Sequence, residues 1–160
     1  MRKALIALFA IALGPALFAQ AGGGQVQIAT VTLSSAQLRV LHGSPVQLIA
    51  APGVGQVLAP ISVVFQYKAG NTPYTVANSA RLATYLSTAN NVVTQVTASG
   101  FLDQAASQLF MMHGIGGLGV SPLSTLENAP MLVRNDDATE WANGDGTVTI
   151  TTIYTVLILQ

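Results

Sequence analysis

The chain has 160 residues and a formal net charge of zero, with 51% hydrophobic residues, 8% charged residues and no cysteine. This length fits one domain. The lack of cysteine excludes a disulfide framework, thiolate metal sites and cysteine nucleophiles. The balance of charge excludes the basic footprint of a nucleic-acid binder, and the apolar content excludes a mostly disordered chain.

The first 21 residues have the pattern of a secretory signal peptide. Arg2 and Lys3 give a basic start, Ala4–Ala19 is almost continuously apolar, and residues 19–21 form an A-x-A cleavage pattern. This apolar segment is short for a membrane helix, which needs about 20 apolar residues, although a retained anchor is the alternative. We predict a signal peptide over 1–21, a flexible glycine-rich arm over 22–30 and one β-domain over 31–160, with no stable membrane span after cleavage.

Most of the remaining chain alternates apolar and polar residues with the period of two that is typical of strands. Valine and threonine recur throughout, and β-branched side chains favour strands. Strands are predicted over Val26–Leu33, Val46–Ala50, Gln56–Lys68, Tyr74–Val76, Leu82–Leu86, Val92–Val96, Met131–Arg134 and Thr147–Leu159. In the last of these, Val148 and Ile150 share one face and Thr149 and Thr151 the other.

Two further segments have helical features. Ser34 or Ser35 can cap a short helix over Ala36–His42 that ends at Gly43. The segment Asp103–Met112 fits a helix face or, over its second half, a buried strand. The fold class predicted is all-β: a single-domain antiparallel β-sandwich or jelly roll with one short helix, a barrel being the other all-β possibility.

Few residues indicate chemistry. The glycines at 114–119 satisfy G-x-G-x-x-G, but Ser121-Pro122 follows them instead of the helix that a dinucleotide site requires. His42 and His113 have no nearby partners at the spacing of a metal site. No G-x-S-x-G nucleophile motif is present. We therefore predict no catalytic, cofactor-binding or metal-binding residues, no cofactor and no enzyme activity.

One acidic cluster lies near the C-terminus. It contains Asn135, Asp136, Asp137, Glu140, Asn143 and Asp145. Oxygen ligands so close together suit calcium, but the spacing is not that of an EF-hand, and a solvated loop is the simpler interpretation. Trp141, within this loop, is either an exposed contact residue or a lid over the edge of the core.

The surface must be unusually poor in charge. Without Arg2 and Lys3, four basic and six acidic residues remain, a net charge of −2, whereas soluble domains carry about 25% charged residues. Strand edges without charged residues readily pair with other chains. We therefore expect the chain to assemble with copies of itself.

Three stretches carry a combined pattern: LRVLHGSPVQLIAAPGVGQV at 38–57, TLENAPMLV at 125–133 and GDGTVTITTIYTVL at 144–157. Together they resemble small β-rich structural proteins of tailed phages and prophages. The resemblance covers most of the chain from Val31 to Leu157 and implies a virion component of the decoration or fibre type. A signal peptide is not expected in that family, so an exported bacterial relative with the same fold is the alternative setting.

These observations lead to two functional hypotheses. The first is a non-enzymatic structural protein that self-assembles on a particle, filament or cell exterior, with itself and other virion or surface proteins as partners and no nucleic acid. It would be exported to the periplasm, cell surface or medium, or lie on the virion surface. The alternative is an exported β-sandwich that recognises a glycan or surface ligand through loops such as Asp136–Gly146.

Overall fold

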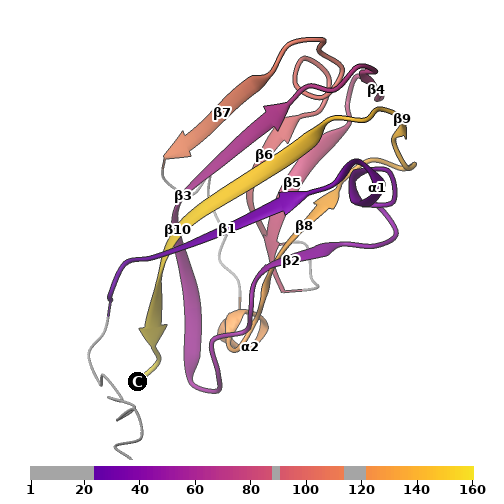
Figure 1. Ribbon diagram of the computed structural model, residues 1–160. Coiled ribbons are helices and arrows are strands. Elements are labelled where there is room, and N and C mark those ends of the chain that lie inside the picture. The colour runs from indigo at the N-terminus through magenta and orange to yellow at the C-terminus, as the bar shows by residue number, and fades with distance from the viewer. Residues whose placement is uncertain (1–23, 88–90, 114–121) are drawn as a thin grey trace, which may run out of the picture.

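Ten strands and two helical turns follow one another in the computed structural model, which describes residues 24–87, 91–113 and 122–160 (Figure 1). In chain order they are β1 (Gln27–Leu33), α1 (Ser35–Leu38), β2 (Val46–Ile49), β3 (Gln56–Lys68), β4 (Tyr74–Thr75), β5 (Arg81–Leu86), β6 (Asn91–Thr97), β7 (Gln108–His113), α2 (Leu123–Leu126), β8 (Met131–Asn135), β9 (Ala142–Asn143) and β10 (Thr147–Ile158).

The strands form two four-stranded sheets. Sheet A has the order β1-β10-β3-β7, sheet B has the order β2-β8-β5-β6, and β4 pairs with β9 in a small third ribbon. Every pairing among the described strands is antiparallel. The chain passes from one sheet to the other after most strands, which is the arrangement of an eight-stranded jelly roll. The predicted all-β sandwich or jelly roll is therefore confirmed.

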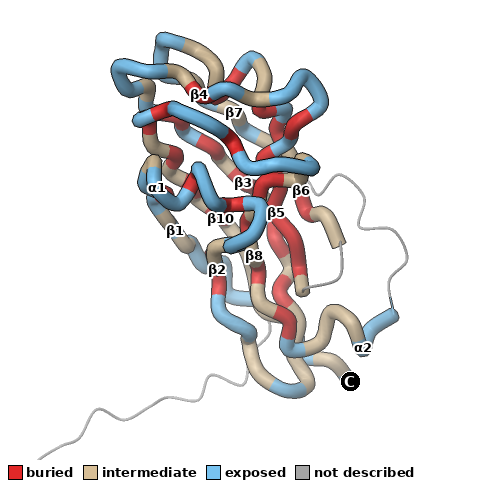
Figure 2. The backbone as a smooth tube through the Cα atoms, turned by 90° about the vertical axis from the view of Figure 1, so that its right-hand side faces the viewer, coloured by how far each residue is buried: buried red, intermediate tan, exposed pale blue. Residues whose placement is uncertain are grey.

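The core lies between the two sheets, where period-two alternation points one side chain of every pair inward. Sheet A contributes Phe65, Tyr67 and Ile150, which pack against residues such as Leu82 and Met131 of sheet B; all five are almost completely buried. Figure 2 shows this pattern as buried segments that alternate mainly with intermediate ones along the strands. The two predicted faces of the last strand are confirmed, because Val148 and Ile150 are buried whereas Thr149 and Thr151 face outward.

A proline lies within the central strand β3. Pro60 pairs with Tyr154 and Ser62 pairs with Ile153, so Ile61 between them has no partner in β10 and forms a β-bulge. Proline cannot donate to a strand ladder and is tolerated at bulges and where one flank of a strand is open. Both conditions hold here, since the pairing of β3 with β7 stops at Ser62.

The structure resolves the ambiguous segment and shortens the predicted helix. Residues 108–113 form strand β7, because β3 supplies hydrogen-bonding partners for its backbone. The segment is a strand, but the predicted burial is wrong, since β7 is an edge strand whose Leu109 and Met111 are exposed. Helix α1 is shorter than the predicted Ala36–His42 and ends at Leu38. Ser34 caps it in a capping box with Gln37. The Glu140 carboxylate accepts the backbone N–H groups of His42 and Gly43, which holds the following residues in turns.

Other boundaries also differ from the sequence analysis. The helical turn α2 and the short strand β9 were not predicted. Strand β1 begins at Gln27, within the range 22–30 assigned to a flexible arm, because Gln27 already pairs with Tyr154 of β10. No helix of the described residues is long and apolar enough to cross a membrane.

The turn before β10 depends on a glycine beside a tyrosine ring. Gly144 has φ of +69°, and a Cβ atom at this position would overlap the ring of Tyr74. The Tyr74 hydroxyl in turn donates to the carbonyl of Gly146 at 2.7 Å. Gly55 has nearly the same φ, +73°, but open space around it.

We expect Gly144→Ala to destabilise the protein more than Gly55→Ala. Both substitutions place a side chain at positive φ, at a cost of about 1–2 kcal/mol. Gly144→Ala adds the overlap with Tyr74, at a cost of about 1–3 kcal/mol more. Urea denaturation of the two variants measures the difference, and equal losses would contradict this packing of Tyr74.

Candidate assembly surface

The outer face of sheet A is a continuous surface of uncharged side chains. Two rows of paired residues cross it from β1 to β7, one residue from each strand in a row. A third row runs from β1 to Ser62 of β3 and ends in β7 at His113, whose side chain lies outside the described residues. The outward residues are Ile28, Thr30 and Thr32 of β1, Thr149, Thr151 and Ile153 of β10, Ser62, Val64 and Gln66 of β3, and Leu109 and Met111 of β7. Lys68, at the end of β3, is the one charged residue in the four strands of this sheet.

Threonines on this face bond to one another across the strands. The hydroxyl oxygens of Thr30 and Thr151 lie 3.1 Å apart, and those of Thr32 and Thr149 lie 2.9 Å apart. Burying a hydroxyl is costly unless it is hydrogen-bonded. These paired hydroxyls therefore lower the cost of removing water from the face.

Large apolar side chains are exposed at the two ends of the same face. Ile28 of β1 is 68% exposed and Val26, just before that strand, is 58% exposed; Leu109 and Met111 of β7 are 62% and 53% exposed. Single exposed apolar residues are common, but groups of them on an uncharged face are typical of interaction sites.

The four edge strands of the two sheets lack the usual protection against pairing. These edges are β1 and β7 in sheet A and β2 and β6 in sheet B. None contains Asp, Glu, Lys, Arg or Pro. Charged residues and prolines are the common means by which natural sheets prevent edge-to-edge association, and the described edge strands have neither.

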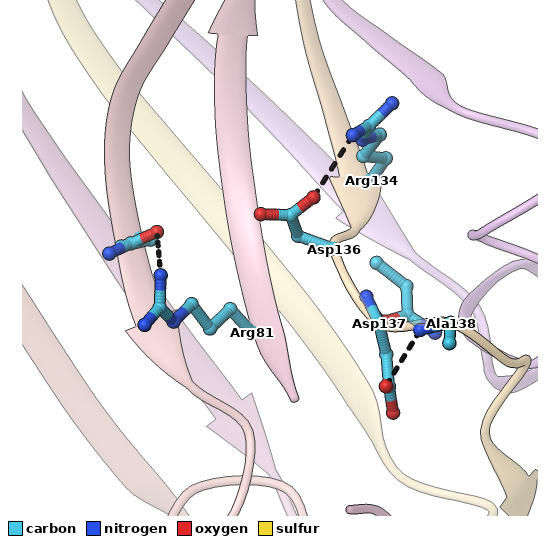
Figure 3. Close-up of polar contacts among 7 residues, drawn as sticks. Arg81, Arg134, Asp136, Asp137 and Ala138 are labelled. Atoms are coloured by element: carbon cyan, nitrogen blue, oxygen red, sulfur yellow. Dashed lines mark hydrogen bonds and ion pairs between the residues drawn. The ribbon is translucent and has the colours of Figure 1, made fainter. Parts of the chain in front are cut away.

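The outer face of sheet B differs because it holds a charged group. The Arg134 guanidinium lies 4.7 Å from the ring centroid of Tyr85 and bonds to Asp136 at 3.0 Å, as Figure 3 shows for the ion pair. Burial raises the pKa of Tyr85 to about 12, and Asp136 raises the pKa of Arg134. Arg81 donates to Gln95 on the same sheet.

The carboxylates of the predicted acidic cluster bind separate parts of the protein. Asp136 pairs with Arg134, Asp137 accepts the N–H of Ala138 (Figure 3), and Glu140 accepts two N–H groups after α1. Asp145 accepts the N–H of Thr72 at 2.9 Å. No group of three or more metal-ligating side chains occurs among the described residues. These carboxylates therefore hold loops and do not converge on a common point.

Two further carboxylates lie outside the acidic cluster and also accept backbone N–H groups. Glu127 accepts the N–H of Gly55 at 2.7 Å, and Asp103 accepts the N–H of Gly100 at 2.7 Å. Burial alone would raise the pKa of Asp103, but the hydrogen bonds that it accepts outweigh burial and lower the pKa.

The other candidate residues fall in several places. Trp141 is 2% exposed and belongs to the core, which agrees with the lid interpretation and not with an exposed contact residue. His42 lies four residues beyond the end of α1 and bonds to Glu140 through its backbone. His113 ends β7, and its side chain, like the glycine motif at 114–119, lies outside the described residues.

A cleft of about 450 Å³ opens at the end of the sandwich where β1 begins. Gln25 and Gln27 line one side, Ile49 and Ala50 at the end of β2 line another, and Tyr154 of β10 contributes to the same lining. The Tyr154 hydroxyl donates to the side-chain oxygen of Gln27 at 2.9 Å. None of the described residues that line this cleft is charged, so it extends the uncharged character of sheet A around the edge formed by β1.

No family model matches the sequence, and no curated protein matches it. Two solved structures are similar over almost the whole chain. A chain of the cyanophage Pam1 capsid asymmetric unit is 15% identical, with 97% of this chain and 96% of that chain covered and a TM-score of 0.43. A chain of the Mud crab tombus-like virus is 7% identical, with 100% and 94% covered and a TM-score of 0.27. The fold assignment rests on the strand pairing described above.

The charge of Asp145 should make stability depend on pH in the acid range. The N–H of Thr72 holds the pKa of this carboxyl below its usual value. A carboxyl with a lowered folded-state pKa stabilises the protein above its unfolded pKa of about 3.9, and this stabilisation is lost as the pH falls through the folded-state pKa.

We therefore expect Asp145→Asn to be destabilising at about pH 6 and less destabilising at about pH 3, below the unfolded-state pKa of about 3.9, where the stabilisation by the charge begins to be lost. Urea denaturation at both pH values measures the two differences. A deficit that stays constant between them would show that the charge of Asp145 does not stabilise the turn.

Proposed function

We propose that this chain is a non-enzymatic structural subunit that assembles with copies of itself through the outer face and edges of sheet A. The observation that carries the proposal is the composition of that sheet, whose four strands hold a single charged residue at one end. Such a face offers neither charge repulsion nor protected edges against a second copy.

The jelly-roll fold by itself is compatible with several functions. Jelly rolls occur in viral capsids, lectins and cupins, and a fold alone does not determine which of these functions a chain has. A loop-based ligand site would draw on Asp136–Gly146, but there Trp141 is buried and the carboxylates hold backbone groups and Arg134. The exposed uncharged sheet favours assembly over loop recognition.

The setting proposed is the exterior of a particle, filament or cell. The resemblance of residues 31–157 to phage structural proteins favours a virion surface, and the pattern of residues 1–21 favours export. Both settings need a subunit whose contacts are made by its own surface. Other virion or surface proteins are further partners in this proposal.

Two substitutions test which sheet makes the contact. Leu109 and Gln47 are exposed residues of edge strands, the first in β7 of sheet A and the second in β2 of sheet B. We expect Leu109→Lys to weaken self-association at least about tenfold, which is about 1.4 kcal/mol. Gln47→Lys should leave it nearly unchanged. Sedimentation velocity over a concentration series measures both, with thermal unfolding as a check on folding.

A wild-type protein that stays monomeric at high concentration would contradict the proposed function. Weakening by Gln47→Lys alone would move the contact to sheet B. Equal weakening by both substitutions would show that added charge acts through the overall charge and not through a defined face.

The same composition predicts that association depends little on salt. Ionic contacts between exposed groups are screened as the Debye length falls from about 10 Å at 0.1 M to about 3 Å at 1 M salt. With Lys68 as the one charged residue in sheet A, we expect the dissociation constant to stay nearly constant over this range. Sodium sulfate should strengthen association, and weakening by sodium chloride would indicate an ionic interface.

A further inference from the structure

We propose that β7 of one copy pairs in antiparallel fashion with the beginning of β1 and the residues just before it in the next copy, in head-to-tail order. The proposal rests on the proposed function and specifies its interface. It names the two edges that meet, their relative direction and their register.

The directions of the strands make this pairing antiparallel. Each strand of sheet A is antiparallel to its neighbour, so β1 and β7, at the two ends of a four-stranded sheet, run in opposite directions. When a second copy continues the sheet in the same orientation, its β7 lies beside β1 of the first copy. The two strands then run antiparallel, which is the slightly more stable pairing per residue.

The exposed apolar residues select the register. Within one copy, Thr32 lies in the row of Leu109, and Thr30 lies in the row of Met111. A shift of four residues along the strands, about 13 Å, instead places Ile28 opposite Leu109 of the next copy. The same shift places Val26 opposite Met111 of the next copy. Four exposed apolar side chains thereby form two cross-strand pairs, which are the stabilising unit of a sheet.

This shift also uses the accessible part of β1. The cleft lined by Gln25 and Gln27 separates the N-terminal half of β1 from Ile49 and Ala50 at the end of β2. In Figure 1, β1 and β7 lie at opposite sides of sheet A. Among the described residues, no further strand pairs with either edge.

A two-fold contact between two β7 strands is the competing arrangement. It would cover Leu109 and Met111 but leave Val26 and Ile28 in water, whereas the head-to-tail contact covers all four. Each square ångström of apolar surface removed from water contributes about 25 cal/mol, so the head-to-tail contact is favoured. Heterologous contacts of this kind build rings or filaments instead of closed dimers.

Cysteine cross-linking tests the register directly, because the chain has no cysteine of its own. The test variant carries Ile28→Cys and Leu109→Cys in the full-length chain. In one copy these positions lie three strand spacings apart across the sheet, about 14 Å, and four residues apart along it, about 13 Å, too far for a disulfide, which needs Cα atoms within about 7 Å. Only contact between copies can join them.

We expect mild oxidation of the assembled test variant to give a ladder of covalent multimers on a non-reducing gel, which a reductant collapses. A control variant with Thr32→Cys and Leu109→Cys reports the unshifted register and should give at least about tenfold less product. A second control with Leu109→Cys alone can form only dimers, and we expect few of them.

The outcomes separate this inference from the proposed function. A ladder from the Thr32 and Leu109 pair, or abundant dimers from Leu109→Cys alone, would overturn the shifted head-to-tail register while self-assembly stands. An assembled protein in which none of the three variants cross-links would also overturn it. Failure of the wild-type chain to sediment as an assembly would overturn both proposals.

Discussion

The antiparallel pairing of β10 with β3 is the constraint on which the rest of the structure depends. These two long strands occupy the centre of sheet A, and their register runs from Thr147 opposite Lys68 to Ile158 opposite Gln56, with one bulge at Ile61. Because side chains alternate between faces, this register places Phe65 and Ile150 in the core and Val64 and Thr151 outside. A slip of one residue would exchange the buried and exposed sets, so the register that forms the core also forms the uncharged outer face.

The chain has few carboxylates, and each of them has a structural role. All six acidic side chains accept a hydrogen bond from a backbone N–H group or from Arg134. They fix the loops at the ends of the sandwich, where backbone groups would otherwise lack partners. Sheet A is left with paired threonine hydroxyls and apolar side chains, and such a surface is kept in water by polar uncharged groups alone or covered by another copy.

Much of the fold follows from the periodicity of the sequence, and the exceptions have local physical causes. The period-two pattern predicts β3 with the bounds that the structure shows, and β10 to within one residue. It could not decide between helix and strand for 103–112, because Leu109 and Phe110 fit both patterns until β3 supplies a partner. It also predicted a first helix longer than the one observed, which ends at Leu38. The Glu140 carboxylate, almost one hundred residues away in the sequence, accepts the N–H groups of His42 and Gly43 and holds this segment in turns. For the candidate surface, the sequence predicted only that few charged residues would be exposed. It could not predict which strands form the edges, because the edges of a sheet depend on strand order.

The sequence by itself determined that the protein is all-β, which side chains of each long strand share a face, and that few charges are available for its surface. These properties are local, since alternation and composition act on neighbouring residues along the chain. Only the tertiary structure decided that β1 and β7 lie at the two edges of one sheet, that Trp141 is buried, and that the acidic residues bind separate loops. The reason is that strand order and long-range hydrogen bonds join residues far apart in the sequence, and local patterns carry no information about which distant segments meet.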